Sequence, residues 1–264
     1  MKYSRTVCTS LIALTSTTLA FRSSSSTFLG QSTIRQASRV IPYSATTPTM
    51  LLNKLFGGGA FGTERIAYQN LDHPGPELAK WAEQGKMPAT SERDPHLALA
   101  TFAGGCFWGL ELAYQRVPGV QYTAVGYAQG PEEFPTYNQV CAGATGHTEA
   151  VMVYYDPKEC DYSKLLDTFF DRVDPTTVNG QGRDFGKQYR TGIYFHTPEQ
   201  EAIARARFEE EAKKYKKPMA TELKAATPFW PAEKYHQQYL EKGGRFGMPQ
   251  DASKGATETI RCYG

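Results

Sequence analysis

The sequence of 264 residues predicts an α/β or α+β domain of two layers, in which helices cover one mixed β-sheet. Two observations predict this fold. From Leu97 onward, apolar runs with the length of a strand alternate with segments that have the period of an amphipathic helix. The hydrophobic content of 40% is enough to bury one substantial core.

The elements of this domain are expected in a fixed order. Apolar periodicity predicts strands at 97–103, 120–127, 148–155, 188–195 and 219–224, and helices at 106–116, 161–172, 198–215 and, shorter, 232–241. The stretches 129–147 and 173–187 are predicted as loops. Loops of this length are uncommon inside a compact domain, so both are candidates for functional loops.

The chain is expected to divide into four parts. Residues 96–264 form the main domain. Its glycine-bearing tail, 242–264, is expected to be mobile, and in the reduced state to be poorly fixed or to lie away from Cys106. Residues 51–95 are rich in glycine and proline and are interpreted as a linker or arm, with one short helix over 77–84. The remaining parts, 1–20 and 21–50, precede this arm.

The first fifty residues have the composition of targeting segments. Residues 1–20 combine Lys2 and Arg5 with an apolar run that ends at Ala20, as a secretory signal does, and 21–50 are Ser/Thr/Arg-rich and free of acidic residues, as transit peptides are. Together they resemble the bipartite leaders of proteins in complex plastids. We therefore expect a plastid location, with the mitochondrion and the secretory pathway as alternatives.

Charge and hydropathy exclude two classes of partner. Six of the 29 basic residues precede Glu64 and none of the 27 acidic residues does, so the rest of the chain carries a net charge of about −4. No basic patch indicates nucleic-acid binding. No stretch after the leader approaches the ~18 apolar residues that a membrane span requires, so no membrane partner is expected.

The motif Gly-Cys-Phe-Trp-Gly (105–109) places a cysteine where a strand gives way to a helix. Unpaired N–H groups and the positive end of the helix dipole favour an anion at that position. We therefore expect the pKa of Cys106 to fall from about 8.5 toward neutrality, which would make this thiol a nucleophile.

The other cysteines do not indicate a scaffold or a metal site. Cys8 lies in the leader, and the four that remain are too few and too scattered for a disulfide framework, with no Cys-x-x-Cys pair or Cys/His cluster. Neither a metal nor another cofactor is therefore expected. Cys141 and Cys160 are expected to pack as small buried apolar groups.

Four blocks in register resemble one family. They are Gly-Cys-Phe-Trp-Gly (105–109), Gly-His-Thr-Glu-Ala-Val (146–151), the stretch from Arg183 to Tyr194, and Ala-Glu-Lys-Tyr-His-Gln-Gln-Tyr-Leu (232–240). This order is similar to that of the A-type peptide methionine sulfoxide reductases, and the tail Ile-Arg-Cys-Tyr-Gly resembles their plastid members. The resemblance implies an α+β two-layer sandwich around a mixed sheet with a ferredoxin-like plait.

The implied reaction requires an acid opposite a thiolate, because a sulfoxide sulfur is a poor electrophile until its oxygen is protonated or strongly hydrogen-bonded. Glu149 begins an apolar strand, where burial would raise its pKa and suit it to donate that proton. The resemblance makes Glu149 the catalytic glutamate.

The resemblance also implies the remaining roles. Tyr137 and Tyr189 hydrogen-bond the sulfoxide oxygen, Asp184 helps to hold this arrangement, and Phe107 and Trp108 form an apolar pocket for the methyl group. The substrate is then the S epimer of methionine sulfoxide in proteins or peptides, and also the free amino acid.

Recycling of Cys106 is assigned by the same resemblance. The sulfenic acid left on Cys106 condenses with a second thiol, and Cys262 in the tail is the candidate. Plastid relatives often carry another cysteine where this chain has Ala256, which leaves a Cys106–Cys262 disulfide for thioredoxin to reduce.

Two other classes stay open. One is another thiol enzyme, such as a peroxidase or a hydrolase. A Cys-His hydrolase would require a histidine beside Cys106, for which His147 and His236 are the candidates. The other alternative is a methionine-binding module without catalytic activity.

Overall fold

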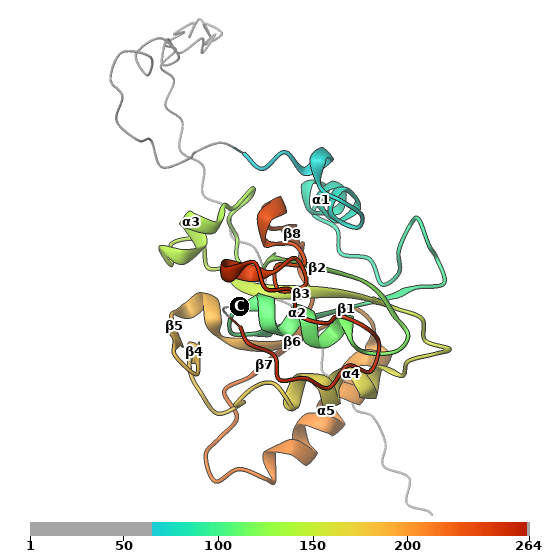
Figure 1. The fold of residues 1–264 in the computed structure, drawn as a ribbon. Helices are drawn as coiled ribbons and strands as arrows, with labels where there is room; N and C mark the ends of the chain where they lie inside the picture. The colour runs from blue at the N-terminus through green and yellow to red at the C-terminus, as the bar shows by residue number, and fades with distance from the viewer. Residues whose placement is uncertain (1–64, 263–264) are drawn as a thin grey trace, which may run out of the picture. The chain divides into compact units, whose positions relative to one another are not determined.

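A six-stranded mixed sheet forms the centre of the computed structural model, which describes residues 65–262 (Figure 1). Its strands are β1 (Ala98–Gly104), β2 (Val120–Ala128), β3 (Thr148–Tyr155), β6 (Thr191–Phe195), β7 (Glu222–Ala225) and β8 (Trp230–Pro231). They lie in the order β7-β6-β1-β3-β2-β8, with β6 and β7 parallel and the other neighbours antiparallel. The predicted α+β fold with a mixed sheet is confirmed. The two targeting segments, 1–20 and 21–50, lie outside the described residues.

Five α-helices accompany this sheet in the described part of the chain: α1 (Gly75–Glu83), α2 (Phe107–Gln115), α3 (Tyr137–Cys141), α4 (Tyr162–Phe170) and α5 (Pro198–Ala212). Short 3-10 turns occupy Tyr68–Asn70, Lys187–Tyr189, Lys234–His236 and Gly244–Phe246. The two predicted loops contain more structure than expected. The first carries α3, and the second carries a hairpin of β4 (Gly180–Gln181) and β5 (Asp184–Phe185).

Alternation along β3 explains how the helices are placed. Val151 and Val153 belong to the core cluster that also contains α2 and α4, while Met152 and Tyr154 belong to the cluster on the opposite face. All eight residues of β3 are buried, as expected for a central strand covered on both sides. Helix α4 contributes an apolar face with helical spacing, at Tyr162, Leu165, Leu166, Phe169 and Phe170.

The arm does not stand apart from the domain. In α1, Leu78 and Trp81 are each 1% exposed and pack in the second core cluster. Glu77 accepts a hydrogen bond of 3.0 Å from the Tyr154 hydroxyl of β3. The short helix expected at 77–84 is confirmed, but residues 65–95 belong to the same compact unit as the main domain because this helix covers sheet residues that would otherwise be exposed.

The prediction of a helix over 232–241 is wrong. Only Lys234–His236 form a 3-10 turn, and Gln238 adopts a left-handed backbone with φ of 50°. The Gln237 side chain instead bonds both backbone groups of Val125, accepting from its N–H at 3.0 Å and donating to its C=O at 2.9 Å. The Gln238 N–H likewise donates to Glu111 of α2 at 2.9 Å and not to a helical carbonyl. Tertiary contacts therefore override the local periodicity.

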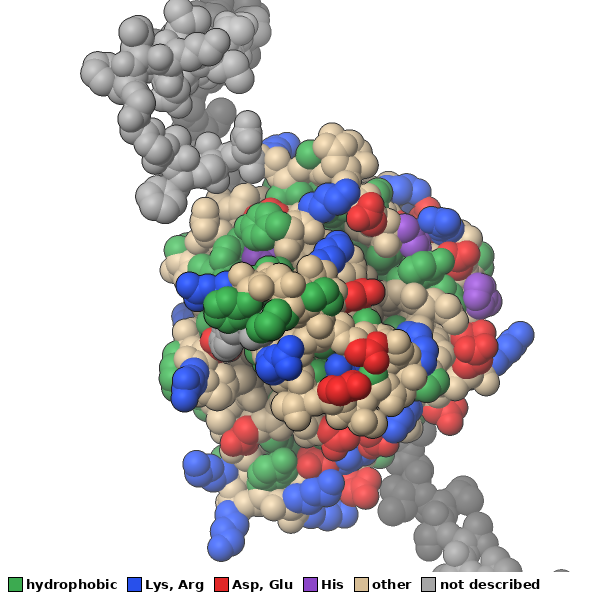
Figure 2. Space-filling model, in the orientation of Figure 1, with side chains coloured by type: hydrophobic (Ala, Val, Ile, Leu, Met, Phe, Trp, Pro, Cys, Tyr) green, Lys and Arg blue, Asp and Glu red, His purple; other side chains and the backbone are tan. Residues whose placement is uncertain are grey.

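The surface agrees with the balance of charges in the sequence. Figure 2 shows Lys and Arg side chains intermixed with Asp and Glu on the face that it displays. Among residues 65–262, no helix has both the length and the apolarity needed to cross a membrane.

Candidate active site

Cys106 lies at the junction between β1 and α2, as the sequence predicted. It occupies the N-cap position of α2 with φ of −57° and ψ of 122°. The preceding Gly105 has φ of +78°, and a Cβ atom there would lie 2.7 Å from the Cβ of Gln181. The turn therefore requires glycine both for its left-handed backbone and for its close contact with the loop that carries Asp184.

The register of the sheet brings Glu149 to this turn. Glu149 alternates with Val151 and Val153 on the face of β3 that packs on α2, and it pairs with Tyr127 of β2. Its Oε2 accepts a hydrogen bond of 3.1 Å from the N–H of Phe107, the first residue of α2. The carboxyl is therefore held at the helix N-terminus next to Cys106, although 43 positions separate the two in sequence.

Burial raises the pKa of Glu149, which makes this side chain a candidate proton donor. The side chain is 2% exposed, and this desolvation raises its pKa to about 8, with a smaller contribution from the charge of Asp184. The hydrogen bond from Phe107 acts in the opposite direction but does not outweigh the burial. Near neutral pH the carboxyl group holds a proton that it can donate.

The pKa expected for Cys106 is wrong in direction. Burial of the thiol, followed by the negative charge of Glu149, raises the pKa of Cys106 well above its ordinary value. A backbone hydrogen bond from Trp108 at the helix N-terminus lowers it, but by less than burial raises it. The helix dipole favours the thiolate as predicted, yet the apolar surroundings disfavour any charge more strongly.

The residues predicted for catalysis and substrate binding meet around one cavity of about 200 Å³. Cys106, Phe107, Trp108, Tyr137, Glu149, Asp184 and Tyr189 all line it. Two further residues, Tyr239 and Arg245, line the same cavity and were not identified from the sequence. The Tyr239 ring stacks on Trp108 with centroids 3.9 Å apart, and its place in the 232–240 block was the signal available for it.

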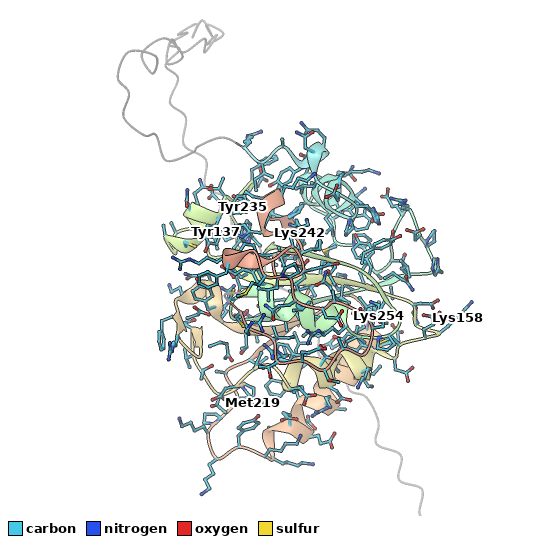
Figure 3. All side chains as sticks on the ribbon, in the orientation of Figure 1. Tyr137, Lys158, Met219, Tyr235, Lys242 and Lys254 are labelled. Carbon is cyan, nitrogen blue, oxygen red and sulfur yellow. The ribbon has the colours of Figure 1, made fainter. Side chains whose placement is uncertain are left out.

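Glu233 links Tyr137 of the cavity to strand β2 of the sheet. Its Oε1 accepts a hydrogen bond of 2.9 Å from the Tyr137 N–H, and its Oε2 accepts one of 2.8 Å from the Tyr127 hydroxyl. Tyr137 and Tyr235 lie on the same side of the molecule, where both rings contact His236 (Figure 3). Burial raises the pKa values of Tyr137 and Tyr189, so both hydroxyls remain donors.

The two candidate histidines of a hydrolase form hydrogen bonds with groups other than the Cys106 thiol. His236 Nδ1 accepts a hydrogen bond of 3.2 Å from the Trp108 indole, and burial lowers its pKa to about 4. His147 bonds two backbone groups, the N–H of Gly130 at 3.1 Å and the C=O of Glu132 at 2.7 Å. Both rings therefore fix neighbouring elements, which does not favour a Cys-His hydrolase.

Cys262 lies close to Cys106, so the expectation that the tail lies away from this cysteine is wrong. Both thiols line one hollow of about 190 Å³ that adjoins the cavity described above and also contains Asp184. Hydrogen bonds hold the tail in place: Gln250 bonds Arg261 in both directions at 2.8 and 2.9 Å, and Arg116 donates to the Glu258 carbonyl at 2.6 Å.

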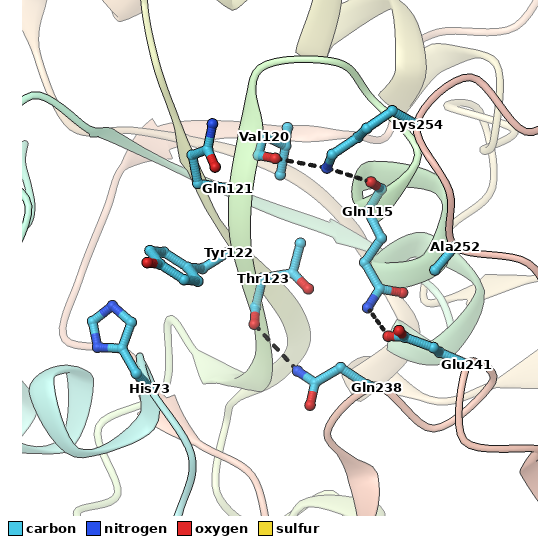
Figure 4. Close-up of a pocket in the computed structure, with 10 residues that line it drawn as sticks. All are labelled: His73, Gln115, Val120, Gln121, Tyr122, Thr123, Gln238, Glu241, Ala252 and Lys254. Atoms are coloured by element: carbon cyan, nitrogen blue, oxygen red, sulfur yellow. Dashed lines mark hydrogen bonds between the residues drawn. The ribbon is translucent and has the colours of Figure 1, made fainter.

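Figure 4 shows a further anchor of the tail, in a polar hollow of about 290 Å³ that no predicted site residue lines. Lys254 donates to the carbonyl oxygens of Gln115 and Val120, both at 2.6 Å. These bonds attach the tail to the end of α2 and the start of β2. The glycines of the tail are therefore not enough to predict its position, because polar side chains elsewhere in the tail attach it to the domain.

The prediction for the other two cysteines is half correct. Cys160 is 4% exposed and packs in the core, as expected. Cys141 is exposed instead, because it ends the short helix α3 on the loop that carries Tyr137. Its thiol and the Tyr137 hydroxyl are hydrogen-bonded to each other.

This arrangement defines a class of protein. A thiol at a helix N-terminus, a protonated carboxyl beside it and an aromatic-walled cavity are the parts of a thiol-dependent enzyme whose substrate must accept a proton. A family model described as peptide methionine sulfoxide reductase matches residues 98–260.

Relatives and solved structures agree with this match. The chain is 49% identical over 213 residues to "Peptide methionine sulfoxide reductase A4, chloroplastic" of Arabidopsis thaliana, covering 81% of this chain and 80% of that one. It is 56% identical over 222 residues to a peptide methionine sulfoxide reductase of Lactuca sativa, covering 84% and 82%. The structure of methionine sulfoxide reductase A of Corynebacterium diphtheriae is similar, with a TM-score of 0.55, 35% identity, and coverage of 60% of this chain and 85% of that one.

The chain belongs to the peptide methionine sulfoxide reductase family, in its A type. It is an oxidoreductase that acts on methionine sulfoxide.

Proposed function

We propose that this enzyme reduces the S epimer of methionine sulfoxide with Cys106 as nucleophile and Glu149 as acid. The single observation that carries the proposal is the meeting of the Cys106 thiol with a carboxyl group of pKa about 8 in one aromatic-walled cavity. Methionine sulfoxide in proteins and peptides, and the free amino acid, present the same methyl sulfoxide group to this cavity.

The first step transfers oxygen. Glu149 donates its proton to the sulfoxide oxygen, which makes the sulfur electrophilic, and Cys106 attacks that sulfur. The hydroxyl group then passes to the Cys106 sulfur as the bond between the two sulfurs breaks. The proton released by the thiol restores the carboxyl. In balance, methionine sulfoxide and the Cys106 thiol become methionine and the Cys106 sulfenic acid. Because the thiol of the free enzyme is protonated, its deprotonation has to accompany the attack.

The remaining cavity residues orient the substrate. The Tyr137 and Tyr189 hydroxyls donate to the sulfoxide oxygen, and Asp184 supports this part of the cavity. Phe107 and Trp108 enclose the methyl group, whose position is fixed by shape and burial.

Stereochemistry follows from these positions. With the methyl group between the aromatics and the oxygen toward Glu149, only one epimer exposes its sulfur to Cys106, and sulfoxide reductases divide the two epimers between enzyme types. We expect the enzyme to consume the S epimer and leave the R epimer, measured by chiral chromatography of a resolved methionine sulfoxide pair. Equal rates on the two epimers would contradict the proposed placement of the methyl group.

The second step regenerates Cys106. Cys262 condenses with the sulfenic acid, and thioredoxin reduces the resulting Cys106–Cys262 disulfide by thiol–disulfide exchange. The shared hollow of the two thiols supports this pairing.

Cys262→Ser separates the two steps. We expect this variant to produce about one equivalent of methionine per enzyme and then to stop with thioredoxin as reductant, because no protein disulfide forms. Burst amplitude and steady-state turnover are the measurements, and Cys160→Ser is the matched control, on a cysteine that lines neither the cavity nor the adjoining hollow. Normal thioredoxin-driven turnover by Cys262→Ser would remove the resolving role from the tail.

A plastid location is proposed for this enzyme. Relatives in Arabidopsis thaliana and Oryza sativa, 49% and 52% identical, carry the name chloroplastic, and residues 1–50 have the composition of a bipartite leader. Mass spectrometry of the mature N-terminus in the source cells tests this location.

A further inference from the structure

We propose that Gly109 and Arg172 form a binding site for the Cys262 thiol, called here the thiol site, which holds the resolving cysteine beside Cys106 before oxidation. The inference rests on the proposed resolving role of Cys262 and adds two positioning residues to it. Neither residue lines the substrate cavity, so the thiol site acts on recycling and not on oxygen transfer.

Gly109 provides the space. It is the buried third residue of α2, two positions after the residue that bonds Glu149. A Cβ atom on Gly109 would lie 2.6 Å from the Cys262 Sγ and 3.7 Å from its Cβ. Since a Cβ atom does not approach a non-bonded sulfur atom to 2.6 Å, any larger residue at this position displaces the thiol. The absence of a side chain is therefore what allows the tail to reach the start of α2.

Arg172 provides the charge. It follows α4, and its Nη2 lies 4.0 Å from the Cys262 Sγ and 3.5 Å from where a Gly109 Cβ would be. Burial and, to a smaller extent, the negative charge of Asp184 in the same hollow raise the pKa of Cys262, and the Arg172 guanidinium opposes them through its charge and its hydrogen bond. Arg172 also lines the hollow that holds both thiols. A fixed positive charge at this position favours the thiolate, which is the form that attacks.

The step that the thiol site assists is the condensation. The Cys262 sulfur attacks the sulfur of the Cys106 sulfenic acid, the S–S bond forms, and the S–OH bond breaks. The Cys262 proton and the departing hydroxyl leave as one molecule of water. Because the thiol is already held near its target, the tail does not have to search for Cys106, and the sulfenic acid has less time to be oxidised further to the sulfinic acid.

Single-turnover experiments on Gly109→Ala, Arg172→Gln and Arg172→Lys test the thiol site. Reduced enzyme is mixed with one equivalent of substrate and quenched at intervals. Methionine is measured by chromatography, and the Cys106 sulfenic acid, trapped with dimedone, and the Cys106–Cys262 disulfide are measured by mass spectrometry. Arg205→Gln, on the exposed face of α5, is the matched arginine control. Thermal unfolding checks the fold, and alanine favours a helix more than glycine does, so Gly109→Ala should not unfold α2.

We expect methionine formation to stay within about twofold of wild type in all variants while disulfide formation slows in two of them. Gly109→Ala should slow the disulfide step about tenfold or more, because a misplacement of about 1 Å can cost on the order of 10²-fold in rate. Arg172→Gln should slow it severalfold at neutral pH and shift its pH dependence upward, while Arg172→Lys, which keeps the charge, should recover much of the rate. Both slow variants should accumulate trapped sulfenic acid.

The outcomes separate this inference from the proposed function. If Cys262→Ser stalls with thioredoxin but Gly109→Ala and Arg172→Gln both form the disulfide at the wild-type rate, the thiol site is wrong and the resolving role stands. An unshifted pH dependence in Arg172→Gln would remove the charge effect of Arg172 even if the rate fell. If Cys262→Ser turns over normally, both the resolving role and the thiol site are wrong.

Discussion

Cys106→Ser is expected to abolish reduction of methionine sulfoxide. A serine hydroxyl is nearly isosteric with the thiol but is not appreciably ionised near neutral pH. An alcohol also cannot accept the sulfoxide oxygen, as the thiol does when it becomes a sulfenic acid. The expected result is no methionine above background, with dithiothreitol or with thioredoxin. The fold should be intact, because the backbone of the turn depends on Gly105 rather than on the thiol.

Cys160→Ser is the control for this experiment. Cys160 is a buried cysteine that packs on Gly119, and it lines neither the cavity nor the adjoining hollow. Its serine variant should retain activity once corrected for any loss of folded protein, which circular dichroism monitors. Residual turnover by Cys106→Ser would mean that another group attacks the sulfur.

Glu149→Gln is expected to lower kcat/KM by roughly 10² or more, since a positioned general acid typically contributes 10²–10⁴ in rate. The amide can still donate a hydrogen bond to the sulfoxide oxygen, but it cannot transfer a proton. The measurement is the initial rate with dithiothreitol near pH 7, on variants whose thermal unfolding matches wild type. A loss smaller than about threefold would mean that tyrosines or water supply the proton.

The pH dependence of the rate is a second test of Glu149 as the proton donor. Glu149 has a pKa raised to about 8, so its acid form is present below that pH and is lost as the pH rises through it. The wild-type rate of oxygen transfer should therefore fall above about pH 8, and Glu149→Gln should lack this fall. A wild-type profile that rises through this range without a break would assign proton donation to another group.

Glu111→Gln is the matched control. Glu111 is a second buried carboxyl, in α2 itself, and burial raises its pKa to about 8 as well. It accepts hydrogen bonds from the Gln238 N–H at 2.9 Å and the Thr123 hydroxyl at 3.2 Å, and it does not line the cavity. Its variant should change stability more than the rate. This comparison separates the loss of a buried carboxyl group from the loss of the catalytic proton.

The turn that carries Cys106 and the strand that carries Glu149 could be found from the sequence because their signals are local, whereas the proposed role of Glu149 came from resemblance to a family. A glycine-flanked cysteine between a strand and a helix predicted the N-cap position of Cys106, and a continuous apolar run predicted β3 with the correct bounds. Tyr137, Tyr189 and Asp184 could be found only by resemblance to a family, since tyrosines and aspartates on loops carry no local sign of a common cavity. Tyr239 and Arg245 were not found even by resemblance, because the segment between them was interpreted as part of a helix and a loose tail.

What the sequence by itself determined is five of the six sheet strands, β1, β2, β3, β6 and β7, and the helices α1, α2, α4 and α5. Strand alternation and helix periodicity depend on neighbours a few positions apart, which is why these elements could be predicted. The tertiary structure alone decided the direction of the pKa shift of Cys106, the exposure of Cys141 and the position of Cys262. Each of these depends on burial or on contacts between segments far apart in the chain: Glu149 reaches Cys106 from β3, and Cys262 reaches Gly109 from the tail. Desolvation is a sum over all atoms that surround a group, so only the folded chain shows whether it outweighs a helix dipole.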